Sequence, residues 1–202
     1  MSKRPNISAR RAAQVFKEAV ACRRLFRGDG KFFKMSEFWE YLCAENDCWK
    51  IKQTKSGPLS DYQRRAGVVA FGDLMTLVVD SELMRLARLG RGFANFILAH
   101  EMCHLMLDHH ANAKVIKNFK VVDSETGKSV LPPTDEELET NYAAIFLQCG
   151  MALFDERLSA VELARRAYTD VALVKKAKSL VRIPEFKSEL ERISKQRPRV
   201  VF

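Results

Sequence analysis

Apolar positions recur every three to four residues in the first part of the chain, and this spacing predicts amphipathic helices. Residues 9–26 gather apolar side chains on one side, at Ala12, Val15, Phe16, Ala19, Val20 and Cys22. A helix with one buried face shows this pattern. The glycines at 28 and 30 end it. A second helix is predicted over 36–45, with Ser36 as its N-cap. We expect both helices to serve as scaffold.

The period changes over residues 66–80, which are rich in β-branched side chains. A turn at Gly72-Asp73 separates two short apolar runs, so a hairpin is predicted with strands near 67–71 and 74–79. Its outer edge could pair with an extended peptide. Alternatively, the hairpin only covers the core.

A longer apolar run covers residues 93–107, and its length favours a buried helix that begins near Arg91 and ends near Asp108. Residues 81–91 fit either a short helix or a loop. After a polar connection over 111–135, with a possible small hairpin at 123–127, another mostly apolar helix is predicted over 135–153. Thr134 or Asp135 caps it. The predicted fold class is therefore α+β, mostly helical, with a small antiparallel sheet before the 93–107 helix and a helical carboxyl-terminal extension.

Composition fits a globular protein, and the basic charge fits either an anionic partner or simply a solvated surface. Hydrophobic residues make up 47% of the 202 positions, enough for a substantial core. No apolar run approaches eighteen residues and no apolar segment follows the basic amino terminus, which predicts neither a membrane span nor a secretory signal. Five cysteines without a C-x-x-C pair suggest free thiols and a cytoplasmic protein. The net charge of +9 makes DNA contact through basic surfaces possible.

The buried run contains an H-E-x-x-H motif at residues 100–104. On a helix, His100 and His104 lie one turn apart on the same face and can bind one metal ion. Glu101 can then act as the base that deprotonates water activated by the metal. The alternative is two core histidines and a buried Glu, whose unpaired polar groups would cost about 1–3 kcal/mol each. Asp108 could orient a ligand imidazole or face solvent. His109 and His110 could in principle be ligands, but both lie beyond the predicted helix end, which favours a place on the surface.

A catalytic zinc needs a third protein ligand, and no further His follows His110. The helix over 135–153 offers several carboxylates. Glu137 is favoured because it shares a polar line with Asn141 and Gln148 on an otherwise apolar helix. Glu136 is the next choice, and Glu139 points away from this line. Asn141 could hydrogen-bond a ligand or the substrate.

The run from Phe96 to Leu107, followed by Glu137-x-x-x-Asn141-Tyr-Ala-Ala, resembles the ImmA/IrrE family of metallopeptidases. The resemblance covers about residues 66–181 and implies a zincin-like core. It implies His100, His104 and Glu137 as metal ligands and Glu101 as the catalytic base. It also implies zinc, with manganese as an alternative because a His₂-carboxylate set accepts both. By resemblance, the substrate is a transcriptional repressor of a mobile element or stress regulon.

This chain departs from the family pattern at two places. Asp108 stands where the family often has His, and no Met-Pro ends the second motif helix. The first departure makes the role of Asp108 uncertain, whereas the second leaves the ligand set unchanged. Tyr142, beside Asn141, is a candidate for stabilising the oxyanion, although its alternative place is the core.

Residues beyond 158 carry two helix signals separated by a turn at 168–170. Ser159 and Asp170 are predicted N-caps, and Glu162 would complete a capping box. The pair resembles a helix-turn-helix, in which Lys175, Lys176 and Lys178 would contact phosphates. Alternatively, these helices only pack beside the core. We therefore predict a metallopeptidase domain over 1–155 and a helical region over 156–202.

Two functions follow from the sequence. The first is a metal-dependent endopeptidase. The second is a metal-stabilised regulator that binds DNA or protein without turnover, which the +9 charge and the helix pair would suit.

Overall fold

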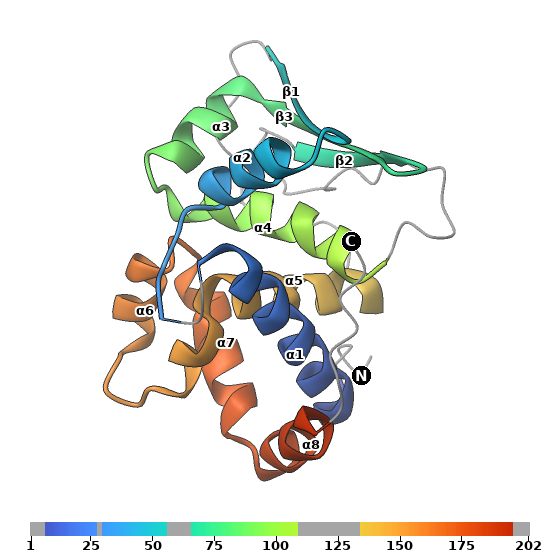
Figure 1. Cartoon of the computed structure of the whole chain (residues 1–202). Helices are drawn as coiled ribbons and strands as arrows, with labels where there is room; N and C mark the ends of the chain where they lie inside the picture. The colour runs from blue at the N-terminus through green and yellow to red at the C-terminus, as the bar shows by residue number, and fades with distance from the viewer. Residues whose placement is uncertain (1–6, 28–29, 56–65, 109–133, 196–202) are drawn as a thin grey trace.

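The computed structural model describes residues 7–27, 30–55, 66–108 and 134–195. The fold is α+β and mostly helical, as predicted. The helices are α1 (Ala9–Phe26), α2 (Met35–Glu45), α3 (Ser81–Arg88), α4 (Gly92–Met106), α5 (Asp135–Cys149), α6 (Ala160–Arg166), α7 (Val171–Arg182) and α8 (Pro184–Ser194), with a 3₁₀ helix η2 (Gly150–Phe154). The strands are β1 (Trp49–Thr54), β2 (Ala66–Phe71) and β3 (Leu74–Asp80). Helix α4 lies between the sheet and a layer of helices that includes α1 and α5 (Figure 1).

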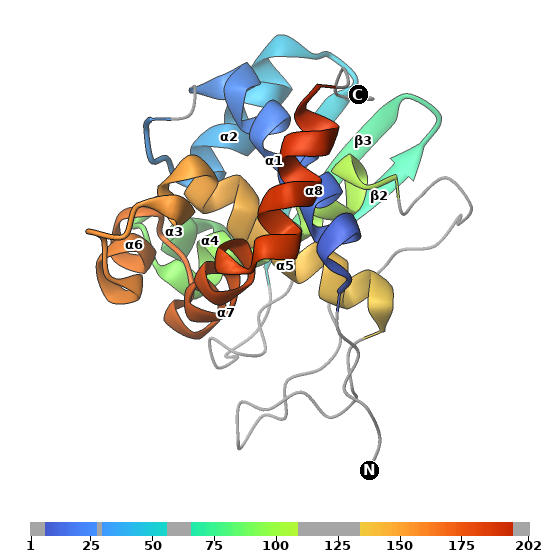
Figure 2. The same cartoon turned by 90° about the horizontal axis from the view of Figure 1, so that it is seen from below.

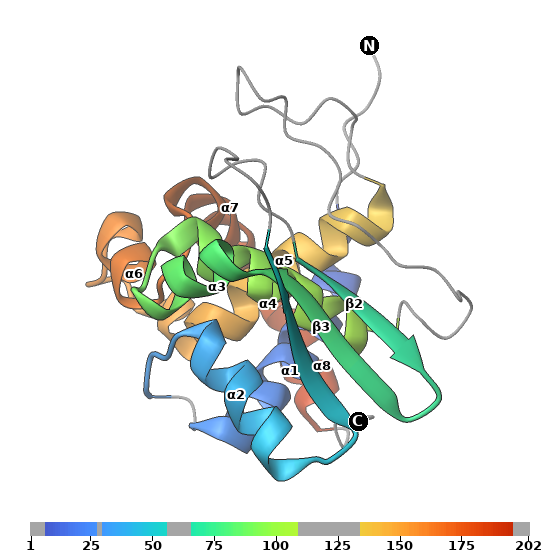
Figure 3. The same cartoon turned by 90° about the horizontal axis from the view of Figure 1, so that it is seen from above.

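The small sheet contains the predicted hairpin and one further strand. β2 pairs antiparallel with β3 through a turn at Gly72, whose φ of 57° suits glycine. β1 pairs with the other side of β3 in parallel, so the sheet order is β1-β3-β2 (Figure 3). The sequence did not predict β1. Its apolar positions are only Trp49 and Ile51, too few to show the alternation of a strand.

Helix α2 begins one residue earlier than predicted, and Ser36 is not its N-cap. The N-cap is Lys34, whose side chain makes no capping hydrogen bond. The Met35 N–H instead donates to the Asn95 side chain at 2.7 Å. Asn95 is fully buried on α4, and its amide nitrogen donates to the Ala87 carbonyl at 2.9 Å. A tertiary contact therefore replaces the local cap and fixes α2 against α4.

The helices on the other side of α4 share one core. Phe16 of α1 contacts Phe146 of α5 and Phe186 of α8, with ring centroids 5.1 and 5.9 Å away. Helix α8 runs alongside α1 (Figure 2). Arg23 is fully buried and donates to the Leu147 and Gln148 carbonyls at 2.9 Å each. These carbonyls lie in the last turn of α5, so the cation stabilises the helix terminus.

The predicted N-caps of the carboxyl-terminal pair are confirmed. Ser159 Oγ accepts from the Glu162 N–H at 3.1 Å, and Asp170 accepts from the Leu173 N–H at 2.9 Å. The prediction that Lys178 reaches phosphate is wrong. Its side chain is buried and donates to two backbone carbonyls of the 155–158 segment at 2.7 Å each. The domain boundary at 155/156 stays a prediction.

Two further predictions concern residues that the structure does not describe. The hairpin at 123–127 and the positions of His109 and His110 lie outside the described residues. Among the helices that are described, none combines the length and the apolar character needed to cross a membrane.

Candidate metal centre

Helix α4 places three polar side chains in the interior of the protein. His100, Glu101 and His104 are 1%, 1% and 2% exposed, although their neighbours on the helix are apolar. Phe96, Leu98 and Met102 are buried around them and give the helix an apolar surface on every side. Such burial requires partners for the two imidazoles and the carboxylate.

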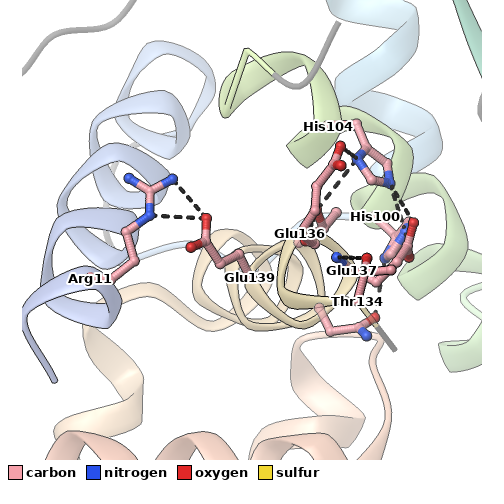
Figure 4. Close-up of polar contacts among 9 residues, drawn as sticks. Arg11, His100, His104, Thr134, Glu136, Glu137 and Glu139 are labelled. Carbon is pink, nitrogen blue, oxygen red and sulfur yellow. Dashed lines mark hydrogen bonds and ion pairs between the residues drawn. The ribbon is translucent and has the colours of Figure 1, made fainter. Parts of the chain in front are cut away.

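The two imidazoles and a carboxylate from α5 converge on one point. His100 Nε2 lies 3.0 Å from His104 Nε2. Glu137 Oε2 lies 3.1 Å from His100 Nε2, and Glu137 Oε1 lies 3.6 Å from His104 Nε2 (Figure 4). Donor atoms about 2.0–2.1 Å from one tetrahedral Zn²⁺ are separated by about 3.3 Å. The three side chains therefore have the donor types and the spacing of a metal site.

Residues of α5 also contact the far nitrogen of each imidazole. Asn141 Oδ1 lies 3.1 Å from His100 Nδ1. An N–H at Nδ1 that donates to this oxygen leaves the lone pair of Nε2 free for a metal. Thr140 Oγ1 lies 3.4 Å from His104 Nδ1 and donates to the Glu136 carbonyl at 2.8 Å. The sequence predicted a contact for Asn141 but missed Thr140, because it lies off the polar line that suggested Glu137.

The carboxylates of α5 divide between three positions. Thr134 caps α5 by accepting from the Glu137 N–H at 3.2 Å, which fixes the first turn beside α4. Glu136 approaches the far nitrogen of His104, with Oε1 3.9 Å from Nδ1. Glu139 turns to the opposite side and forms an ion pair with Arg11 of α1 at 2.7 Å (Figure 4). The packing of α4 on α5 thus brings Glu137 to both Nε2 atoms.

Glu101 lies beside this cluster with half of its carboxylate unsatisfied. One oxygen accepts from the backbone N–H of Val68 in β2. The other, Oε2, has no hydrogen-bond partner among the described residues. Burial raises the pKa of Glu101 well above its usual value, the negative charge of Glu137 raises it further, and the Val68 N–H opposes both. An unsatisfied buried oxygen beside two ligand imidazoles is where a water molecule on a metal would donate a proton.

The residues therefore fit a divalent metal ion such as zinc. Two imidazoles and one carboxylate form a His₂Glu donor set, which leaves a fourth position for water or substrate. Asn141 and Thr140, which contact the far imidazole nitrogens, and Glu101 supply the surrounding hydrogen-bonding groups that such sites need.

The remaining predicted site residues lie elsewhere. Asp108 is exposed, follows the end of α4 and has a φ of 56°, so it does not continue the face of His100 and His104. Tyr142 is half-buried, with its ring 6.0 Å from that of Phe146 on the side of α5 that packs on α1. Burial raises the pKa of its hydroxyl. The structure places Tyr142 in this packing layer.

Gln148 continues the polar line of α5 but has another partner. It is buried, donates to the Tyr168 carbonyl at 3.0 Å and accepts from the Thr169 hydroxyl at 2.7 Å. The expectation that the whole polar line serves a metal is therefore too broad. Its first half faces α4, and its last member holds the turn between α6 and α7.

Comparison of the chain with models of protein families, with curated proteins and with solved structures found no match.

Proposed function

We propose that this protein is a metal-dependent endopeptidase. The observation that carries the proposal is the convergence of His100, His104 and Glu137 beside a buried Glu101 with an unsatisfied oxygen. A merely structural metal site would be expected to have four protein ligands and no neighbouring base. The resemblance of the two motif helices to the ImmA/IrrE family favours the same function.

Each residue has a definite role in this proposal. His100, His104 and Glu137 hold the metal, with zinc as the first choice and manganese as the alternative. When bound, the metal polarises the substrate carbonyl and lowers the pKa of water. Glu101 takes a proton from the attacking water and later delivers it to the amide nitrogen of the departing product. Asn141 positions the His100 ring through the contact at Nδ1.

The position of β2 supports an extended peptide as the substrate. Among the described residues β2 is an edge strand, because β3 separates it from β1. The Val68 N–H points toward Glu101. Along β2, every second residue directs its backbone N–H and C=O away from β3. Ala70, two residues after Val68, therefore also presents these groups outward. A peptide added to this edge would pass beside Glu101.

The resemblance suggests a transcriptional repressor as the protein substrate, cut at one bond. A cytoplasmic location would suit such a substrate. All five cysteines lie in the described residues and are free thiols, in keeping with a reducing compartment.

Three substitutions test the proposal. Glu101→Gln should retain the metal and the fold but abolish cleavage of a repressor substrate. The neutral amide of Gln is too weak a base to take a proton from the attacking water. Glu137→Gln should lose metal, whereas Glu136→Gln, its neighbour in the same helical turn, should retain it. Metal content is measured on protein purified without chelators, and cleavage is measured on candidate repressors by mass spectrometry. If Glu101→Gln cleaves the substrate as fast as the parent, the peptidase proposal is refuted. If the purified protein contains no metal and binds none when metal is added, the metal site is refuted.

The second function, a metal-stabilised regulator without turnover, has one observation in its favour. The exposed side of α7 carries Lys175, Lys176 and Arg182 and is therefore basic. This regulator and the peptidase differ in the expected effect of Glu101→Gln, which should leave every activity of a non-catalytic regulator intact.

A further inference from the structure

A basic hollow lies where two connections of the chain meet the end of helix α6. It is formed by the α1–α2 connection, the α3–α4 connection and the end of α6. Its volume of about 610 Å³ is in the range of small-molecule sites. We define the basic hollow by the residues that line it, which are Lys31, Phe32, Gly90, Arg165, Arg166 and Tyr168.

Positive charge prevails in the basic hollow. Arg165 and Arg166 share a single carboxylate, Glu162, at 3.2 and 2.7 Å. Their side chains are 73% and 48% exposed, so each guanidinium can also reach a ligand. Lys31 adds a further cation. Two guanidiniums on one carboxylate leave an excess positive charge, and an exposed ion pair of this kind is readily exchanged for another anion.

Tyr168 occupies an unusual backbone position at the edge of the hollow. It follows the last turn of α6 with a φ of 51°, where helices usually place glycine. Its ring lies against Gly90, at which an added Cβ would be 2.9 Å from the ring. The Gln148 side chain donates a hydrogen bond to the Tyr168 carbonyl and thereby fixes the backbone of this turn. A bulky residue is uncommon in a left-handed conformation, which makes the Tyr168 side chain a candidate for a functional role.

The hollow therefore combines cations with two aromatic rings. Phe32 and Tyr168 are both half-buried and both line it, and Lys34 Nζ lies 6.0 Å from the centre of the Tyr168 ring. Phosphodiesters bind cations, whereas unpaired bases stack on aromatic rings. We propose that the basic hollow binds single-stranded nucleic acid, with phosphates at Arg165 and Arg166 and a base against Tyr168. Bases within a duplex are stacked on each other and cannot use these rings.

The site is separate from the metal centre. Gly90 precedes the first residue of α4, and His100 lies eight residues after that first residue. At about 1.5 Å per residue, roughly 12 Å of helix separates the start of α4, beside the hollow, from His100. The sheet, with Lys52 exposed on β1, lies on the other side of α4 from α6 (Figure 1). Lys52 therefore provides a matched control for the loss of one surface cation.

Fluorescence anisotropy of a labelled oligothymidylate with the full, metal-containing chain tests the proposal. Arg165→Glu should weaken binding at least tenfold and reduce the slope of log Kd against log salt, because it removes phosphate contacts. Lys52→Glu should change Kd less than twofold. Tyr168→Leu should weaken binding about tenfold, whereas Tyr168→Phe should bind like the parent because it keeps the ring. Circular dichroism confirms that each variant is folded.

Four results would overturn the proposal. The parent could fail to bind the oligothymidylate at moderate salt, or Arg165→Glu could weaken binding no more than Lys52→Glu, which would indicate a non-specific charge effect. Tyr168→Leu could bind as tightly as the parent. Finally, a duplex or an acidic peptide of equal charge could compete as well as the single strand, which would assign the hollow to a different class of partner.

Discussion

The hydrogen bond between Asn141 and His100 predicts a measurable contribution to metal affinity. Asn141 Oδ1 lies 3.1 Å from His100 Nδ1, and the imidazole is only 1% exposed. Asn141→Leu keeps the side-chain size but removes the acceptor. Water cannot readily replace it, so the Nδ1–H of a metal-bound His100 would be buried without a partner. In the metal-free protein the ring can change tautomer, and the penalty falls mainly on the metal-bound form.

The expected loss follows from two independent magnitudes. An unsatisfied buried donor costs about 1–3 kcal/mol. Loss of a hydrogen bond behind a metal-bound His typically reduces metal affinity about 10- to 100-fold, which corresponds to about 1.4–2.8 kcal/mol. We therefore expect Asn141→Leu to raise the Kd for zinc by 10- to 100-fold, measured by competition with a chromophoric chelator at constant pH.

Two further variants isolate the cause. Asn141→Asp retains an acceptor for the Nδ1–H and should bind zinc at least as tightly as the parent. Glu139→Gln changes the same helix on its opposite side, where Glu139 pairs with Arg11, and should leave the Kd unchanged. If Asn141→Leu binds zinc within twofold of the parent, the hydrogen bond does not support the ligand and the reasoning fails.

Two other predictions concern stability. Arg23→Met should lower the free energy of unfolding by about 3 kcal/mol, because it removes the buried hydrogen bonds from Arg23 to the Leu147 and Gln148 carbonyls. In urea melts, Arg24→Met at the neighbouring exposed position should change the free energy of unfolding by less than about 0.5 kcal/mol. If both substitutions had equal effects, the stabilising role of Arg23 would be contradicted. In the metal-free protein, burial raises the pKa of Glu101. Its contribution to stability is therefore fully present below the unfolded pKa and is lost as pH rises through the folded pKa. Urea midpoints in chelator should fall more steeply with rising pH in the parent than in Glu101→Gln.

Local signals in the sequence determined much of the helical framework. Ser159 and Asp170 cap the helices that they were predicted to cap, and Thr134 is the N-cap among the two candidates, Thr134 and Asp135. An N-cap needs only a side-chain oxygen and an N–H three residues later. The β2–β3 hairpin was predictable for the same reason, since Gly72 lies between two neighbouring strands. The alignment of His100 with His104 follows from helical periodicity alone.

Contacts between distant segments required the tertiary structure. Asn95 rather than Ser36 fixes the start of α2, and β1 finds its partner β3 more than twenty residues along the chain. No local pattern reports such pairings. The role of Gln148 also depended on such a contact. Its spacing along α5 suggested a place near the metal site, whereas its hydrogen bonds are with the α6–α7 turn.

In the candidate metal centre, too, some features follow from the sequence and others only from the tertiary structure. The sequence determined that two imidazoles lie on one face of a buried helix next to the carboxylate of Glu101, because residues four apart share a face whatever the helix packs against. It left Glu136 and Glu137 as alternatives and missed Thr140. Only the packing of α4 on α5 decided that Glu137 reaches both Nε2 atoms while Glu136 and Thr140 approach the far nitrogen of His104. Periodicity defines the face of one helix, whereas the rotation and offset between two helices are set by the side chains that pack between them.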